Sequence, residues 1–204
     1  MKNSLNKNNK KSSVVVVFGG SRGIGLAIGE LLKNNKWIVI LADLDTPGIE
    51  VTKKFDFFKV DITNTEQLNK LSIYIEKKYR CLDGLVNAAG YNSHSSVVEL
   101  DDKKMEDLLN VHLSGVVRSS RVFYDLLKNN NSSIVNFSSI GARIGRPRRA
   151  IYAAAKAGVE AFTRTLSIEW ANDNIRVNCV VPGIINTRMV SQNIKDGLVD
   201  VESL

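Results

Sequence analysis

Short apolar runs rich in valine, isoleucine and phenylalanine recur along the chain, and longer stretches with helical spacing separate them. Runs of this length, bounded by glycine, proline or polar residues, are typical of buried β-strands. The predicted strands are 14–18, 37–42, 55–60, 82–87, 132–137 and 175–181. The predicted helices are about 25–33, 65–78, 103–128 and 151–172. The pattern therefore predicts a regular alternation of strand and helix.

Strands that alternate with helices predict a parallel sheet, because each helix returns the chain to the starting edge of the sheet. Near-continuous apolar strands also predict helices on both faces, since a strand with one wet face would alternate. We therefore expect a single α/β domain with a doubly wound parallel sheet over 13–204, after a solvated tail at 1–12. Ligands of such sheets bind outside the carboxyl ends of the strands, so candidate chemistry is expected there.

Composition excludes several classes of protein. The chain has 204 residues, of which 44% are hydrophobic, and this suffices for one domain with a sizeable core. No apolar run approaches the roughly 20 residues that span a membrane, and the first residues lack a signal-peptide core, so we expect a cytoplasmic protein with no membrane partner. Cys81 and Cys179 predict neither a disulfide framework nor a metal site. His94 and His112 form no metal cluster either, and a structural role suits each at least as well as a functional one.

The net charge of +7 raises the question of nucleic acid. The excess lies in two segments, a tail with Lys2, Lys7, Lys10 and Lys11 and a loop with Arg143, Arg146, Arg148 and Arg149. Without these segments the chain is nearly neutral, so no broad basic face for a phosphate backbone is predicted. We therefore expect no nucleic-acid partner.

The first predicted strand leads into GGSRGIG (19–25), and a predicted helix follows. Gly19, Gly23 and Gly25 allow a tight turn and a close approach of the backbone to a pyrophosphate, which would lie at the positive end of the helix. Glycine clusters are common in turns, but a position between a strand and a helix is the one that a dinucleotide site requires.

Asp43 ends the second predicted strand, 18 residues after Gly25. An acid there accepts hydrogen bonds from the ribose hydroxyls of NAD and repels the extra phosphate of NADP. Arg22 in the glycine loop favours the opposite choice, because a guanidinium pairs with phosphate. We give Asp43 the greater weight, so NAD is favoured and NADP is the alternative cofactor. A solvated loop acid, as Asp45 could also be, is the other interpretation of Asp43.

Tyr152 and Lys156 stand four residues apart in a predicted helix and therefore share a face. A free phenol titrates near pH 10, too high for easy proton transfer at neutral pH, and a nearby ammonium would stabilise the phenolate. The spacing alone is common by chance. Ser138 and Ser139 end the preceding predicted strand, however, and other polar and glycine-rich motifs end the fourth and follow the sixth. A proton-transfer site at this edge of the sheet is therefore predicted.

Taken in order, the motifs of the chain resemble those of the short-chain dehydrogenase/reductase family over about Ser13 to Met189. They are GGSRGIG (19–25), VDIT (60–63), NAAG (87–90), NVHLSG (110–115), NFSS (136–139), YAAAK (152–156) and RVNCVVPGIINT (176–187). The resemblance implies a Rossmann-type fold. It also implies an oxidoreductase that transfers a hydride between a nicotinamide cofactor and a secondary alcohol or ketone.

The resemblance further implies roles for individual residues. Tyr152 would be the general acid in carbonyl reduction and the base in alcohol oxidation, while Lys156 would assist it and hold the nicotinamide ribose. Ser139 would bind the substrate oxygen, with Ser138 as the alternative, and Asn110 would hold a water that links Lys156 to solvent. The cofactor residues would be Gly19, Ser21, Arg22, Gly23, Ile24, Gly25, Asp43, Asp61, Ile62, Asn87, Ala88, Ala89, Gly90, Tyr152, Lys156, Pro182, Gly183, Ile185 and Thr187.

The loop IGARIGRPRRAI (140–151) borders the substrate in this family. Its local charge excess predicts that Arg146, Arg148 or Arg149 meets an acidic small-molecule substrate, and the alternative is a solvated surface loop.

The end of the chain departs from the family pattern. Relatives usually continue beyond the segment 186–204 with a substrate-covering part, a helix and a strand that build one subunit interface. We expect a homo-oligomer whose interface this departure leaves open. An alternative function is therefore an NAD(P)-binding protein with weak or no catalysis. The complete set of Asn110, Ser139, Tyr152 and Lys156 favours the enzyme.

Overall fold

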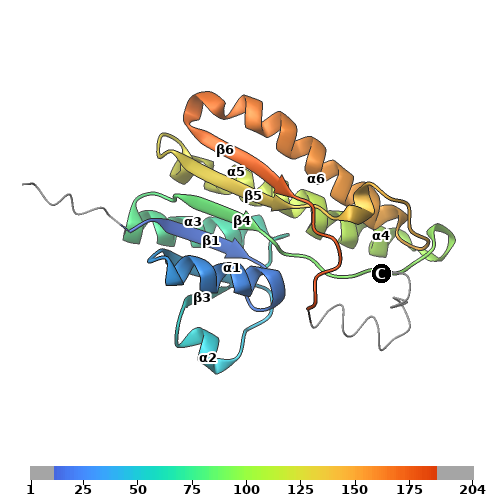
Figure 1. Ribbon diagram of the computed structural model, residues 1–204, viewed down its shortest axis with the longest axis horizontal. Coiled ribbons are helices and arrows are strands. Elements are labelled where there is room, and N and C mark those ends of the chain that lie inside the picture. The colour runs from blue at the N-terminus through green and yellow to red at the C-terminus, as the bar shows by residue number, and fades with distance from the viewer. Residues whose placement is uncertain (1–11, 188–204) are drawn as a thin grey trace, which may run out of the picture.

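The computed structural model describes residues 12–187. A six-stranded parallel sheet with the order β3-β2-β1-β4-β5-β6 forms its centre (Figure 1). The strands are β1 (Val14–Phe18), β2 (Ile38–Asp43), β3 (Asp56–Lys59), β4 (Gly84–Asn87), β5 (Ser132–Phe137) and β6 (Ile175–Val180). The helices are α1 (Gly23–Asn34), α2 (Ile49–Thr52), α3 (Thr65–Tyr79), α4 (Asp102–Leu109), α5 (Gly115–Leu127) and α6 (Ala150–Glu169). The predicted doubly wound sheet in one domain is confirmed.

Strand β1 shows why the sheet has a core on each face. Val14, Val16 and Phe18 point into a core that residues of α3, α5 and α6 complete. Val15 and Val17, on the opposite face, pack with residues of α1. All five side chains are buried, which explains the continuous apolar run in the sequence.

The order of strands reverses between β1 and β4. The chain moves from β1 to β2 and β3 on one side, and then crosses to β4, β5 and β6 on the other. At the carboxyl end of β1, Phe18 pairs with Ala42 of β2 and with Asn87 of β4. The loops that follow β1 and β4 therefore diverge, and this is where a sheet of this kind opens a ligand crevice.

The long helix predicted over 103–128 is present as one uninterrupted helical segment that contains a π turn. It consists of α4, a π-helical turn at Asn110–Ser114, and α5. A π turn holds one residue more than an α turn, so the side chains that follow it face a different direction from those of a continuous helix. The π turn lies beside α6, the helix that carries Tyr152 and Lys156.

The link between β2 and β3 contains the single-turn helix α2, in keeping with the short segment available there. Within residues 12–187 no helix has the length and apolar character needed to cross a membrane. The same residues contain no group of three or more potential metal ligands. Residues 1–11 of the tail predicted over 1–12, and the segment 188–204, lie outside the described residues.

Candidate active site

Two cavities lie side by side at the carboxyl ends of the strands. One, of about 370 Å³, is lined by the glycine loop and by residues that follow β2 and β3, and the other, of about 220 Å³, is lined by residues that follow β5 and β6. Six residues line both: Ile24, Ala88, Ala89, Gly90, Tyr91 and Thr187. The cavities therefore form one elongated cleft, whose two parts can each hold one end of the same ligand. We call them the glycine-loop cavity and the Tyr152 cavity.

The glycine loop leaves no room for a side chain at Gly19 or Gly25. The backbone of Gly19 has a φ of +75°, and a Cβ atom there would lie 2.7 Å from the backbone of Ala88. A Cβ atom on Gly25 would lie 2.1 Å from the carbonyl oxygen of Gly19. No acidic side chain lies in the first turn of α1, and no side chain caps it. The amide end of this helix is thus available to an anion at the cavity, as the sequence predicts.

The Asp43 carboxylate is held in a fixed position. Its Oδ2 accepts hydrogen bonds from the backbone N–H of Ser21 at 3.0 Å and from the Ser21 hydroxyl at 2.6 Å. Its Oδ1 accepts the backbone N–H of Asp45 at 3.2 Å. Arg22 forms an ion pair with Asp45, at 2.7 Å. The positive charge of Arg22 is thus paired with Asp45, whereas the hydrogen-bond partners of the Asp43 carboxylate are all neutral.

The remaining predicted cofactor residues divide into two groups. Asp61, Ile62, Ala88, Ala89, Gly90, Pro182, Gly183, Ile185 and Thr187 line the cleft. The side chain of Asn87 is not brought to it. Asn87 is 2% exposed, donates to Asn136 at 2.8 Å and accepts from Ser119 at 2.7 Å. Asn87 therefore links β4 to β5 and α5 by hydrogen bonds. It helps to position Ala88, Ala89 and Gly90, which follow it and line the cleft.

Tyr152 and Lys156 share a face of α6 and both line the Tyr152 cavity. The ammonium nitrogen of Lys156 lies 6.0 Å from the centroid of the Tyr152 ring and donates a hydrogen bond to the carbonyl oxygen of Phe137 at 2.8 Å. Lys156 is 6% exposed, and this burial lowers its pKa to about 8. The predicted pairing of a phenol with a buried cation is thus present in the structure.

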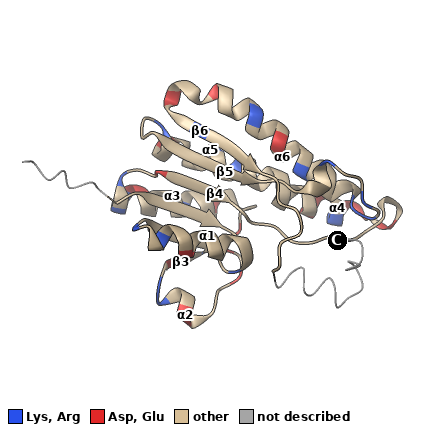
Figure 2. Ribbon diagram, viewed as in Figure 1, with Lys and Arg blue, Asp and Glu red and all other residues tan. Residues whose placement is uncertain are grey.

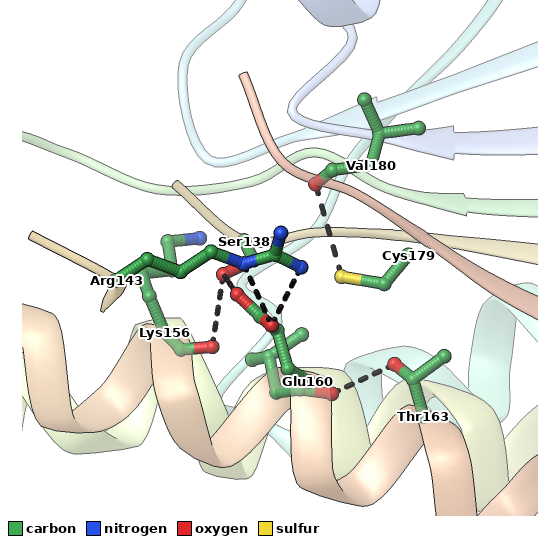
Figure 3. A network of polar contacts seen from close by, with 8 residues as sticks. Ser138, Arg143, Lys156, Glu160, Thr163, Cys179 and Val180 are labelled. Atoms are coloured by element: carbon green, nitrogen blue, oxygen red, sulfur yellow. Dashed lines mark hydrogen bonds and ion pairs between the residues drawn. The ribbon is translucent and has the colours of Figure 1, made fainter. Parts of the chain in front are cut away.

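Ser138 and Ser139 have different environments. The hydroxyl of Ser138 is buried and bonds to the carbonyl oxygen of Lys156 at 3.0 Å and to Glu160 at 2.8 Å (Figure 3). Glu160 also pairs with Arg143 at 3.0 Å, and this pairing, with Ser138, holds its pKa below the usual range. The hydroxyl of Ser139 accepts the N–H of Gly141 at 3.1 Å, which leaves its own proton to donate. Ser139 is therefore the serine suited to a substrate oxygen.

Asn110 is not among the residues that line the cleft. Its side-chain oxygen accepts a hydrogen bond from Arg118 at 3.1 Å. His112, two residues later in the π turn, lines the Tyr152 cavity instead, with its ring centroid 5.2 Å from that of Tyr152. Its Nε2 faces the backbone N–H of Tyr91 at 3.4 Å, and burial lowers its pKa to about 3, so the ring is neutral. The role that the family resemblance implies for Asn110, holding a water that links Lys156 to solvent, stays a prediction, and His112 is a cavity residue that the sequence did not single out.

The loop before α6 is rich in basic positions (Figure 2). Its arginines have different partners. Arg143 pairs with Glu160, and Arg148 makes a bidentate pair with Glu99 at 3.0 and 2.6 Å. Arg146 and Arg149 line the Tyr152 cavity. Of the three predicted substrate residues, the structure brings these two to the site and turns Arg148 away.

The buried ammonium of Lys156 predicts a pH-dependent stability. Its pKa falls from 10.5 in an unfolded chain to about 8 in the fold, so between these values only the unfolded chain binds the proton. The free energy of unfolding should therefore rise with pH across this window, by on the order of 3 kcal/mol from this group. Urea unfolding of the wild type and of Lys156→Met between pH 7 and 10.5, without cofactor, measures the difference. Parallel pH curves for the two proteins would contradict the burial of a charged lysine.

Comparison with known proteins agrees with the geometry. A model of the short chain dehydrogenase family matches residues 13–197. The chain is 31% identical to a 3-oxoacyl-acyl-carrier-protein reductase of Thermotoga maritima, over 89% of this chain and 78% of that protein. It is 32% identical to carbonyl reductase family member 4 of Danio rerio, over 88% of this chain and 78% of that protein.

A solved structure extends the agreement to the fold. The crystal structure of a short-chain dehydrogenase/reductase, a glucose/ribitol dehydrogenase from Brucella melitensis, superposes with a TM-score of 0.82 at 30% identity, over 90% of this chain and 77% of that one. The family match spans nearly all of the described residues, and both cavities lie where the fold places a dinucleotide and its substrate. The chain belongs to the short chain dehydrogenase family of nicotinamide-dependent oxidoreductases.

Proposed function

We propose that the protein is an NAD-dependent oxidoreductase that interconverts a secondary alcohol and a ketone, with Tyr152 as the general acid and base. The observation that carries the proposal is the convergence of Ser139, Tyr152 and Lys156 on one cavity, which continues into the glycine-loop cavity. A nicotinamide dinucleotide bound along the cleft supplies the hydride acceptor or donor. The close backbone packing at Gly19 and Gly25 and the open amide end of α1 fit such a group.

The protein's own residues manage the proton and the developing charge. In reduction, the Tyr152 hydroxyl donates its proton to the carbonyl oxygen, and in oxidation the phenolate takes the proton from the alcohol. Ser139 donates a hydrogen bond to the same substrate oxygen and stabilises the negative charge that develops there. Lys156 places a positive charge on the face of the Tyr152 ring, fixed by its bond to the carbonyl of Phe137. His112 packs against the Tyr152 ring as a neutral group, with the two ring planes at 78°.

The preference for NAD rests on Asp43. Its carboxylate lines the glycine-loop cavity and is fixed by Ser21, whereas the charge of Arg22 is already paired with Asp45. A ribose with two free hydroxyls can donate to the carboxylate, but a phosphate at that place would meet like charge without a free cation.

Replacement of Asp43 by alanine should lower the ratio of kcat/KM with NAD to kcat/KM with NADP by roughly 10- to 100-fold, the range for hydrogen bonds to a charged group. Initial rates with both cofactors at saturating substrate give the ratio. In the companion variant Asp45→Asn, the freed Arg22 should improve the use of NADP while the use of NAD changes little. A wild type that prefers NADP, or an unchanged ratio in Asp43→Ala, would contradict the assignment.

The alternative of a cofactor-binding protein without catalysis is less well supported. Proton donor, oxyanion partner and buried cation all face one cavity, which a protein that only binds cofactor does not require. Quenching of NADH fluorescence, followed by turnover assays with a panel of small ketones and secondary alcohols, tests the proposal. Saturable NADH binding with turnover of at least one carbonyl compound supports it. Binding without turnover across the panel favours the alternative, and no binding of either nicotinamide dinucleotide rejects both.

A further inference from the structure

Four arginines occupy the loop before α6, but only two of their charges are paired with carboxylates. Arg143 is neutralised by Glu160 and Arg148 by Glu99. Among residues 12–187, Arg146 and Arg149 form no ion pair with an acidic side chain, and both line the Tyr152 cavity. The loop therefore pairs Arg143 and Arg148 with carboxylates and leaves two unpaired charges at the cavity, on the half-buried Arg149 and the exposed Arg146.

Arg149 carries this charge in a place where water is partly excluded. The residue is half-buried, and desolvation lowers the pKa of its guanidinium. Its guanidinium carbon lies 5.2 Å from the centroid of the Tyr152 ring. The first turn of α6, which begins at the next residue, has no acidic side chain that could compensate it. A cation removed from water without a counter-ion is costly, which indicates that an anionic ligand completes the site.

His94 orients Arg149 without neutralising it. Its Nε2 lies 2.7 Å from a terminal nitrogen of the Arg149 guanidinium, and an arginine can only be the donor of that hydrogen bond. Burial and the charges of Arg149 and Arg148 lower the pKa of His94, so the imidazole is the neutral acceptor. The loop that carries His94 is joined to the arginine loop by the backbone bond from Ser95 N–H to Arg148 O at 3.1 Å. The guanidinium is thus aimed by neutral contacts and keeps its full charge.

We propose that Arg149, assisted by Arg146, binds the carboxylate of the substrate, and that the substrate is a small oxo acid or the corresponding hydroxy acid. This inference rests on the proposed function, because it places the substrate carbonyl at Ser139 and Tyr152. The guanidinium of Arg149 lies against the Tyr152 ring itself, so carboxylate and carbonyl are separated by only a few bonds, as in 2-oxo and 3-oxo acids. The Tyr152 cavity, of about 220 Å³, suits a molecule of this size.

If Arg149 had only a packing role, its replacement would have a different effect on activity. If the guanidinium served only to cover the Tyr152 ring and hold His94, its replacement would weaken every substrate equally. A carboxylate site instead predicts a loss that depends on the charge of the substrate. The comparison of acetoacetate with acetoacetamide isolates this charge, because the two molecules have nearly the same size and differ in the anionic group.

The variant Arg149→Gln keeps a donor for His94 and removes the charge. We expect it to lower the ratio of kcat/KM for acetoacetate to kcat/KM for acetoacetamide about 10- to 100-fold, as for loss of a charge-assisted hydrogen bond. The matched control is Arg148→Gln, which removes one positive charge from the same loop at a side chain bound to Glu99. Its ratio should stay within about twofold of the wild type. Equal losses on both substrates in Arg149→Gln, or no preference for acetoacetate in the wild type, would overturn the proposal.

A binding measurement separates this proposal from the proposed function. Malonate carries carboxylates but has no ketone that could be reduced. Calorimetric titration of the protein with malonate therefore reports the anion site without turnover. We expect saturable binding that weakens at least tenfold in Arg149→Gln and is unchanged in Arg148→Gln. Absence of malonate binding, or equal binding by all three proteins, would overturn the carboxylate site even if the enzyme reduces neutral ketones. Malonate binding lost only in Arg149→Gln would support it even if the ketone panel shows no turnover.

Discussion

Replacement of Tyr152 by phenylalanine is expected to lower kcat by about 10²- to 10⁴-fold, the range that general acid–base catalysis contributes. The change removes one oxygen atom and keeps the aromatic ring. The ring contacts with His112, at 5.2 Å between centroids, and with the Arg149 guanidinium, at 5.2 Å, do not involve the hydroxyl. The fold and the affinity for the cofactor should therefore persist while proton transfer is lost.

The measurement combines turnover, NADH fluorescence and the thermal unfolding temperature. A matched control is Tyr74→Phe, which also removes a phenol hydroxyl but lies on α3, where that hydroxyl accepts a bond from Lys78 at 2.7 Å. Its kcat should stay within about twofold of the wild type. A Tyr152→Phe variant with more than a tenth of the wild-type kcat would remove Tyr152 from the role of proton donor. An equal loss of NADH binding would instead assign Tyr152 to cofactor binding.

The sheet could be predicted from the sequence because its strands are continuous apolar runs. A strand buried on both faces, such as β1, has a short run of β-branched residues, and a glycine follows it directly. This combination is typical of a strand rather than a helix. The glycine loop and Asp43 were predictable for the same reason, since the loop follows β1 and Asp43 is the last residue of β2. Their positions follow from where β1 and β2 end and from the parallel pairing of these two strands. The apolar runs of the sequence mark both strand ends.

The region around Asn110 could not be predicted, because the periodicity of the sequence does not show a π turn. Within this turn, His112 lines the Tyr152 cavity and Asn110 does not. The His112 ring fits closely against Gly90, where a Cβ atom would lie 2.7 Å from it. The absence of a side chain at position 90 and the imidazole at 112 are thus complementary, across 22 residues of sequence.

The roles of the arginines depend on partners that are distant along the chain. Glu99 precedes Arg148 by 49 residues, and Glu160 follows Arg143 by 17. Sequence reasoning found the charge excess of the loop but had no means of pairing its members. Tertiary contacts divide them into two that hold the loop in place and two that face the cavity, and this division makes a specific substrate site possible.

The substitution Gly25→Ala is expected to be the most damaging change in the glycine loop. The added methyl group would lie 2.1 Å from the carbonyl oxygen of Gly19, far inside van der Waals contact. That oxygen belongs to the backbone, and Gly19 is itself fixed against Ala88, where a Cβ atom would lie at 2.7 Å. No side chain can rotate away to relieve the overlap, so the loop or the start of α1 must shift.

We expect Gly25→Ala to weaken NADH binding at least 100-fold and to lower the free energy of unfolding by about 1–3 kcal/mol or more, as for overpacking of a close-packed interior. The matched control is Gly48→Ala, where a Cβ atom has no neighbour within 4 Å and the backbone does not have a positive φ. Fluorescence titration with NADH and urea unfolding of both variants give the two quantities. If the two variants bind NADH equally, the glycine loop does not hold the dinucleotide. If only Gly25→Ala loses NADH binding while remaining folded, the close contact between α1 and the turn after β1 is required to bind the dinucleotide, because the added methyl group meets the backbone only at Gly25.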